Sequence, residues 1–236
     1  MKYQIVGDSD NPLVEVALGT NETIKVESGG MVYMQGVELE GKMNADKQGI
    51  GGFLKAVVRS MASGESIFIT LAHGMSADGR IGIAPATPGV VRHLTVGEKQ
   101  YRLNTGSFLA CDDSVGYNII TQNSLGKALF GGTGGFFIME TTGQGDLLVN
   151  AFGDMVELEI TEDKPLTIDN HHVVAWDSTL DYEIKVASGV IGFKSGEGLV
   201  NEFHGNGKVL LQTRNVYSLA NALIPYLPSS TSSSSD

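Results

Sequence analysis

The amino-acid sequence predicts an all-β fold of three tandem repeats, and three observations support that prediction. Apolar and polar residues alternate with a period of two in several short segments, as in strands that bury one face. Two neighbouring segments recur three times along the chain at nearly constant spacing. Glycine occupies 31 of the 236 positions, about 13%, which is roughly twice its average usage. Together these features predict short strands separated by tight turns.

The repeat is defined by two segments whose copies lie 77 and then 65 residues apart. The first segment reads LVEVALG at 13–19, VVRHLTV at 90–96 and MVELEIT at 155–161. The second reads TIKVESGGMVYM at 23–34, QYRLNTGSFLAC at 100–111 and PLTIDNHHVVAW at 165–176. Both offsets hold in both segments without a gap, so the three copies are expected to share one pattern of strands.

The second segment carries the clearest strand signal. Ile24 and Val26 are apolar, whereas Lys25 and Glu27 are polar, and the other two copies alternate in the same way. A bend signal follows in each copy, and apolar residues then resume at Met31-Val32, Phe108-Leu109 and Val173-Val174. Each copy is therefore expected to hold two strands joined by a bend.

A β-hairpin is predicted to close each copy, because an apolar segment is followed by a turn signal and a second apolar segment. The expected hairpins join 67–74 to 79–85, 136–143 to 145–153, and 198–205 to 208–213. The last turn contains Asn206-Gly207, a pair in which both residues tolerate positive φ. The high glycine content is thus explained in part by turn residues that recur in all three copies.

Two short helices are expected beside the strands. Apolar residues recur at helical spacing in the 49–66 insert of the first copy, which predicts a helix there. The same spacing predicts a C-terminal helix over 216–227, and Pro225 is expected to end or kink it. Six of the last eight residues, 229–236, are Ser, so this tail is expected to be disordered.

The repeats are expected to form one domain over 1–228. Their approximate bounds are 12–88, 89–153 and 154–215. A few strands with one apolar face do not fold alone. We therefore expect the three copies to close around a pseudo-threefold axis, which would bury their apolar faces and cover their edge strands.

Four motifs make the chain resemble bacterial members of the family named for altered inheritance of mitochondria, which are mitochondrial biogenesis proteins in fungi. They are SGGMVYM at 28–34, GESIF at 64–68, TGSFLACDD at 105–113, and LQTRN at 211–215 followed by SLANALIPYLP. The resemblance implies three repeats similar to the subunit of the tryptophan RNA-binding attenuation protein, a short double-stranded β-helix. It implies no particular enzyme activity, and fold alone does not transfer the RNA-binding role.

Charge and cysteine content restrict the function classes. Asp and Glu number 27 against 16 Lys and Arg, a formal net charge of −11, and no basic cluster is present. Nucleic acid and anionic membranes are therefore not expected as partners. No apolar run approaches the ~20 residues that span a bilayer, and no signal peptide is recognised. With the single Cys111, this predicts a soluble cytoplasmic protein.

No catalytic motif is found, so the chain is predicted not to be an enzyme and to hold no cofactor. Neither a G-x-S-x-G nor an H-E-x-x-H motif occurs. Cys111 precedes Asp112 and Asp113, whose negative charges would raise the thiol pKa and disfavour a nucleophilic thiolate. Trp176 stands at the equivalent position of the third copy, which indicates a packing position.

His171 and His172 are the candidate residues of an alternative function. The first two copies have Gly29-Gly30 and Gly106-Ser107 at these positions, so two imidazoles depart from the pattern of small residues. Imidazole is a common metal ligand, and Asp169 lies nearby in the sequence. Adjacent side chains on a strand point to opposite faces, however, which disfavours a shared metal. The alternative is a small-ligand or metal-binding β-barrel with a site near this pair.

The leading hypothesis is a non-catalytic structural or interaction protein that forms a homo-oligomer or binds a protein partner. The inserts of the first two copies contain apolar residues in segments that are otherwise rich in glycine, and these form the candidate interaction surface: Phe53, Leu54, Val57 and Phe130. Core packing explains the same residues equally well, and both interpretations stay open on the sequence alone.

Overall fold

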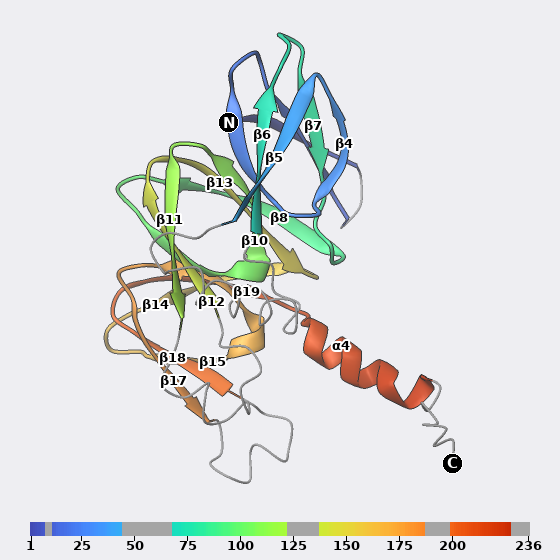
Figure 1. Ribbon diagram of the computed structural model, residues 1–236. Helices are drawn as coiled ribbons and strands as arrows, with labels where there is room; N and C mark the ends of the chain where they lie inside the picture. Colours follow the sequence, from blue (N-terminus) through green and yellow to red (C-terminus); the bar gives the residue numbers. More distant parts are fainter. Residues whose placement is uncertain (8–10, 44–67, 122–136, 187–198, 228–236) are drawn as a thin grey trace, which may run out of the picture.

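The computed structural model describes residues 1–7, 11–43, 68–121, 137–186 and 199–227. The described chain is all-β apart from one short helix and three 3-10 turns, which confirms the predicted all-β class. The N-terminal, middle and C-terminal thirds follow one another along the long axis of the molecule, and the C-terminal helix projects from its side (Figure 1).

Among the described residues, each third of the chain contributes six strands, and a further strand, β1 (Lys2–Val6), precedes them. The first third contains β2 (Leu13–Ala17), β3 (Thr23–Glu27), β4 (Met31–Gln35), β5 (Val37–Met43), β6 (Phe68–Gly74) and β7 (Arg80–Ile83). The middle third contains β8 (Gly89–Val96), β9 (Tyr101–Asn104), β10 (Phe108–Asp112), β11 (Val115–Thr121), β12 (Phe137–Gly143) and β13 (Gly145–Phe152). The last third contains β14 (Met155–Ile160), β15 (Leu166–Asp169), β16 (Val173–Asp177), β17 (Asp181–Val186), β18 (Leu199–His204) and β19 (Gly207–Gln212).

The strands pair antiparallel by the same rule in each third. The fifth strand lies between the second and the fourth, and the sixth lies between the first and the third. Each third is thereby divided into two small sheets. The alternating residues of β3 show why such strands form, because Ile24 and Val26 are buried while Thr23, Lys25 and Glu27 are half-buried.

Two seams join the thirds. β3 of the first third pairs with β10 of the middle third, and β9 of the middle third pairs with β16 of the last. Each seam fuses two small sheets into one six-stranded sheet, in the orders β5-β6-β3-β10-β13-β8 and β11-β12-β9-β16-β19-β14. The remaining sheets are β1-β2-β7-β4 and β15-β18-β17. β4 and β15 are therefore sheet edges among the described strands.

The three expected hairpins are not formed. β6 and β7 lie in different sheets, as do β12 and β13, and β18 and β19. The physical reason is that each fifth strand already has neighbours on both sides, so the sixth strand cannot pair beside it. The turn at Asn206-Gly207 reverses the chain between β18 and β19, but it carries the chain from one sheet to another.

The expected closure of the three repeats within one chain is also not observed. The two seams use the second strand of the first two thirds and the third strand of the last two. Among the described strands, the third strand of the first third, β4, and the second strand of the last third, β15, are left unpaired on their outer edges. Covered edges were expected on all copies, and in the described part of the chain these two edges have no strand beside them. The proposed likeness to the attenuation-protein subunit stays a prediction.

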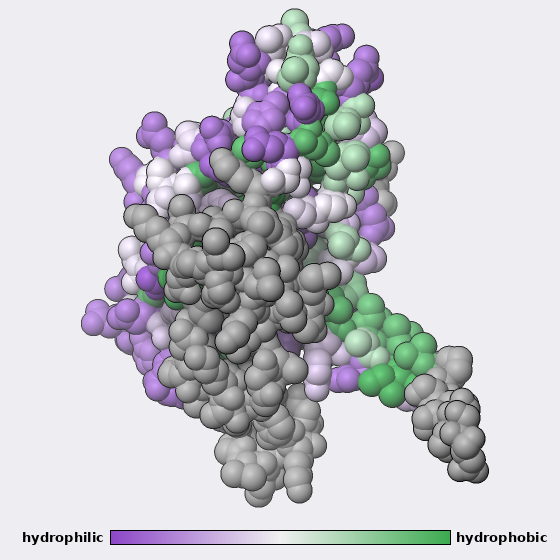
Figure 2. All heavy atoms as spheres, viewed as in Figure 1, coloured by the Kyte–Doolittle hydropathy of each residue, from purple (hydrophilic) through white to green (hydrophobic). Residues whose placement is uncertain are grey.

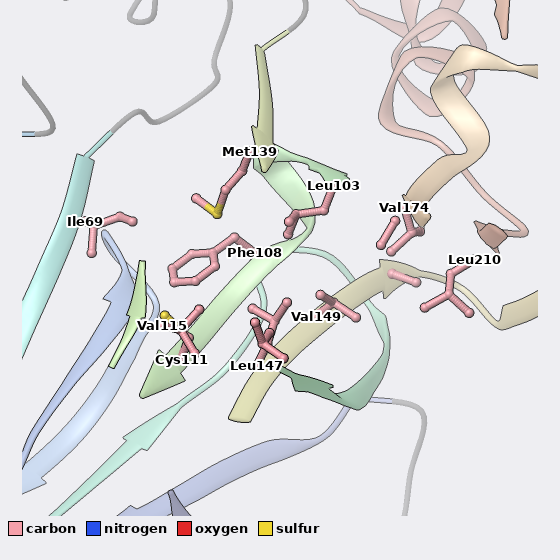
Figure 3. Packing of buried hydrophobic residues seen from close by; sticks show 13 residues of the cluster. Ile69, Leu103, Phe108, Cys111, Val115, Met139, Leu147, Val149, Val174 and Leu210 are labelled. Atoms are coloured by element: carbon pink, nitrogen blue, oxygen red, sulfur yellow. The ribbon is translucent and has the colours of Figure 1, made fainter. Parts of the chain in front are cut away.

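Three clusters of buried apolar side chains form the core, and the central one draws on all three thirds. Phe108, Leu147 and Met139 of the middle third pack with Ile69 from β6 and Leu210 from β19 (Figure 3). Because the clusters extend across the seams, the thirds are held together by apolar burial as well as by strand pairing.

The C-terminal helix lies within the range expected for it. α4 spans Val216–Leu223, and a 3-10 turn over Ile224–Tyr226 contains Pro225, which cannot donate a helical hydrogen bond. Among the described residues, no helix is both long and apolar enough to cross a membrane. The expected helix in 49–66 and the serine-rich tail lie outside the described residues.

Candidate functional site

The most unusual surface of the molecule is the exposed strand β4. Its apolar residues Met31, Val32, Tyr33 and Met34 are 37–55% exposed. The strands at the same position in the other two thirds are β10 and β16, whose corresponding apolar residues are at most 2% exposed. The difference arises because β3 covers β10 and β9 covers β16, whereas no described strand lies against the outer edge of β4.

The Tyr33 side chain of β4 is nevertheless held in place. The Tyr33 ring lies so closely over Gly82 of β7 that a Cβ atom at this glycine would collide with the ring. The Tyr33 hydroxyl donates a hydrogen bond to Glu15 of β2. This bond lowers the pKa of the Glu15 carboxyl and raises the pKa of Tyr33. The edge strand is thus a preformed apolar surface rather than a loose segment.

Helix α4 is a second exposed apolar surface. Val216, Tyr217, Leu219 and Leu223 are all at least 45% exposed, and no residue of the helix is buried. Figure 2 shows hydrophobic atoms along this helix, where it projects from the body. Large contiguous apolar patches on a protein surface mark interaction sites, and this helix is a candidate for one.

His171 and His172 lie at the base of α4 and not on a strand. They belong to a 3-10 turn over Asn170–His172 that joins β15 to β16. The Asp169 side chain caps this turn by accepting a hydrogen bond from the His171 backbone N–H at 2.8 Å. Small residues are therefore not required here, whereas the first third makes its bend through Gly29 at φ +86°.

Both rings of the histidine pair contact the N-terminal end of α4. The His171 ring stacks on Tyr217 with centroids 5.0 Å apart and an interplanar angle of 13°. His172 Nδ1 donates to the Gln212 carbonyl at 2.7 Å, and its Nε2 accepts from Asn215 Nδ2 at 2.8 Å. The Asn215 side chain in turn accepts from the Ser218 N–H and caps the helix.

This geometry gives the histidine pair a structural task. Both ring nitrogens of His172 are engaged in hydrogen bonds, so neither is free to ligate a metal without breaking one. The hydrogen bonds from His171 lower the pKa of Asp169 against the opposing effect of its burial. In the described ranges, no three His, Cys, Asp or Glu side chains are grouped so that they could hold a metal ion.

Cys111 is a packing residue of β10. It is 1% exposed and belongs to the central core cluster. Burial, with a smaller contribution from Asp112 and Asp113, raises the pKa of the thiol to about 12. The carboxylates act in the direction that the sequence indicated, but desolvation is the larger cause.

Glu27, at the end of β3, is a half-buried residue that the sequence did not single out. Its Oε2 atom is buried and has no hydrogen-bond partner, and burial raises the pKa of the side chain to about 7. The residues at the equivalent position both have partners: the Asn104 amide donates to the Val173 carbonyl across the seam, and Asp169 accepts from the His171 N–H of the following turn. A polar residue ending a strand is common, so the sequence holds no signal of this burial.

The predicted interaction surface of Phe53, Leu54, Val57 and Phe130 lies outside the described residues. The apolar surfaces that the structure does place are β4 and α4. The sequence placed Met31 and Val32 in an expected strand and in a family motif, but it did not indicate an exposed surface. The residues of β4 are mostly apolar, like those of the buried strands β10 and β16. Only the pairing of the sheets therefore shows that the β4 side chains are exposed.

The fold and the exposed strand define a class: an all-β protein built of several antiparallel sheets, with an exposed apolar strand at one sheet edge. The sequence matches the family described as Mitochondrial biogenesis AIM24 over residues 3–214, and the chain belongs to this family. The recognition from sequence motifs is thereby confirmed.

Two relatives are from Streptococcus pyogenes. An uncharacterised protein of serotype M6 is 44% identical over 232 residues, which cover 98% of this chain and 92% of that protein. A crystal structure from a structural genomics project is 41% identical, with a TM-score of 0.79, and the match covers 96% of this chain and 99% of that one.

Proposed function

We propose that the protein is a non-catalytic assembly protein that acts by self-association through its exposed apolar strand. The observation that supports the proposal is a difference in side-chain exposure among the three residues at one repeat position. Val32 on β4 is 55% exposed, while its counterparts Leu109 and Val174 are 0% exposed. A strand with core-like side chains and an open backbone edge is a template for pairing with another strand.

The reactive groups of the chain support a role without catalysis. The Cys111 thiol is buried, and its raised pKa keeps it protonated at neutral pH. Both ring nitrogens of His172 form hydrogen bonds, one of them to Asn215, the N-cap of α4. These two side chains therefore serve packing and capping.

Self-association can be tested by sedimentation equilibrium over a range of protein concentrations. The wild-type protein is expected to be an oligomer that dissociates on dilution. Val32→Lys places a charge on the exposed edge, which should shift the protein towards the monomer because edge lysines block strand pairing.

Val156→Lys is the matched control. Val156 is 42% exposed on β14, so the variant adds the same charge at a similarly exposed valine away from β4. It should leave the association constant unchanged. A wild-type monomer at all concentrations would contradict the proposal, as would equal effects of the two substitutions.

A further inference from the structure

The internal seams specify which surface covers β4. Resting on the proposed function, we infer that the partner is a second copy of this chain, and that β15 of one copy pairs antiparallel with β4 of the next. In both internal seams a second strand of one third covers the third strand of the following third. β15 is the second strand of the last third and β4 is the third strand of the first. Of the open sheet edges, these two therefore have the same roles as the strands that pair in the internal seams.

The register of this pairing follows from the repeat offsets of 77 and 65 residues. The first seam pairs Val26 with Ala110, Lys25 with Cys111 and Ile24 with Asp112. The second pairs Leu103 with Ala175, Arg102 with Trp176 and Tyr101 with Asp177, and each of these residues is the repeat equivalent of one in the first seam. Applied once more, the same register pairs Ile168 with Tyr33, Thr167 with Met34 and Leu166 with Gln35.

The side chains of the intermolecular seam differ from the internal ones in one respect. Lys25 Nζ donates to the carbonyls of Asp113 and Val115 across the first seam, at 2.5 and 2.9 Å. Arg102 donates to the Leu180 carbonyl, which is equivalent to that of Val115, at 3.2 Å across the second.

Thr167 takes the place of these two cations on β15. The intermolecular seam therefore relies on backbone hydrogen bonds and apolar contact, without the charged anchor of the internal seams. Screening by salt weakens ion pairs but not apolar burial. Association should accordingly change little with ionic strength, and this seam should be the one that opens on dilution.

The proposed contact is heterologous, because each copy uses a different edge on each side. Contacts of this type generate closed rings if the rotation between copies closes and open filaments if it does not. A two-fold dimer in which β4 pairs with β4 is the main competing arrangement, and a cross-linking experiment separates the two.

The test uses engineered cysteines at one predicted pair, Met34→Cys and Thr167→Cys. Directly opposite residues of an antiparallel pair have Cα atoms about 4.5–5.5 Å apart, which a disulfide can bridge. The two single variants are mixed, oxidised with diamide and separated on a non-reducing gel. A covalent dimer is expected only in the mixture, whereas the double variant should give a ladder of higher multiples.

Val32→Cys mixed with Thr167→Cys is the matched control. Val32 lies two residues from Met34 on the same strand, so the sulfur atoms are too far apart in the proposed register. Cys111 is buried and should not contribute.

Each alternative outcome has a distinct meaning. If Met34→Cys alone cross-links, or if the shifted control cross-links equally well, the inferred partner edge or register is wrong. If the wild type sediments as an oligomer but no pair cross-links, the inference fails while the proposed function stands. If the wild type is a monomer, both fail.

Discussion

Replacing Glu27 with Gln is expected to remove a pH-dependent loss of stability. The Glu27 carboxyl has a folded-state pKa of about 7 because of burial, against 4.5 in an unfolded chain. Between these values the folded state binds more protons than the unfolded state, so stability falls as pH rises through this window. Below about pH 4.5 the Glu27 carboxyl is largely neutral in both states, so its ionisation has little effect on the free energy of unfolding.

The magnitude follows from the difference between the two pKa values. At 1.36 kcal/mol per pH unit, a pKa of about 7 against 4.5 corresponds to about 3.4 kcal/mol. Glu27 is only half-buried, and solvent screening reduces this figure to about 1.5–2 kcal/mol. Between pH 4.5 and pH 8, the free energy of unfolding of the wild-type protein should therefore fall by about 1.5–2 kcal/mol more than that of the Gln variant.

Urea unfolding followed by fluorescence of the single Trp176 measures this difference at fixed protein concentration. Glu98→Gln is the control, because it makes the same substitution at an exposed position. The amide that Glu27→Gln introduces also lacks a partner, but that cost does not depend on pH. A wild-type-to-variant difference that is the same at pH 4.5 and pH 8 would refute the reasoning.

Three further outcomes are expected. Cys111 should react with Ellman's reagent only as fast as the chain unfolds, and rapid labelling of the native protein would show that β10 is accessible. Asn215→Ala removes the cap of α4 and the donor to His172, which should cost about 1 kcal/mol and speed chymotryptic cleavage within the helix; unchanged cleavage would deny the capping role. Phe203→Ala should lower the free energy of unfolding by about 3–5 kcal/mol, because Phe203 is fully buried with its ring 5.6 Å from that of Trp176; a change below about 1 kcal/mol would contradict this packing.

Part of the fold was predictable because strand alternation is a local property. Ile24, Val26 and their equivalents are apolar at every second position, and they lie in strands. The three hairpins were wrong because a turn signal such as Asn206-Gly207 reports a reversal of the chain and not the sheet that receives the next strand. Neighbours from elsewhere in the chain had already occupied both sides of each fifth strand.

The candidate site was less predictable. His171 and His172 were recognised as unusual, but the hydrogen bonds of His172 to Gln212 and Asn215 join residues 40 and 43 positions apart in the sequence. The exposure of β4 depends on β3 and β9 being used in other seams. Neither the hydrogen bonds of His172 nor the pairing of β3 and β9 can be predicted from the local pattern of residues.

The sequence by itself determined the all-β class and the family, since both depend on residue types and their spacing along the chain. Only the tertiary structure decided that the same kind of strand is core in two thirds and surface in the other. The physical reason is that burial belongs to a pair of strands: Phe108–Asp112 and Val173–Asp177 each have a covering strand within the chain, and Met31–Gln35 has none among the described residues. That unmatched edge is where the molecule is expected to meet its next copy.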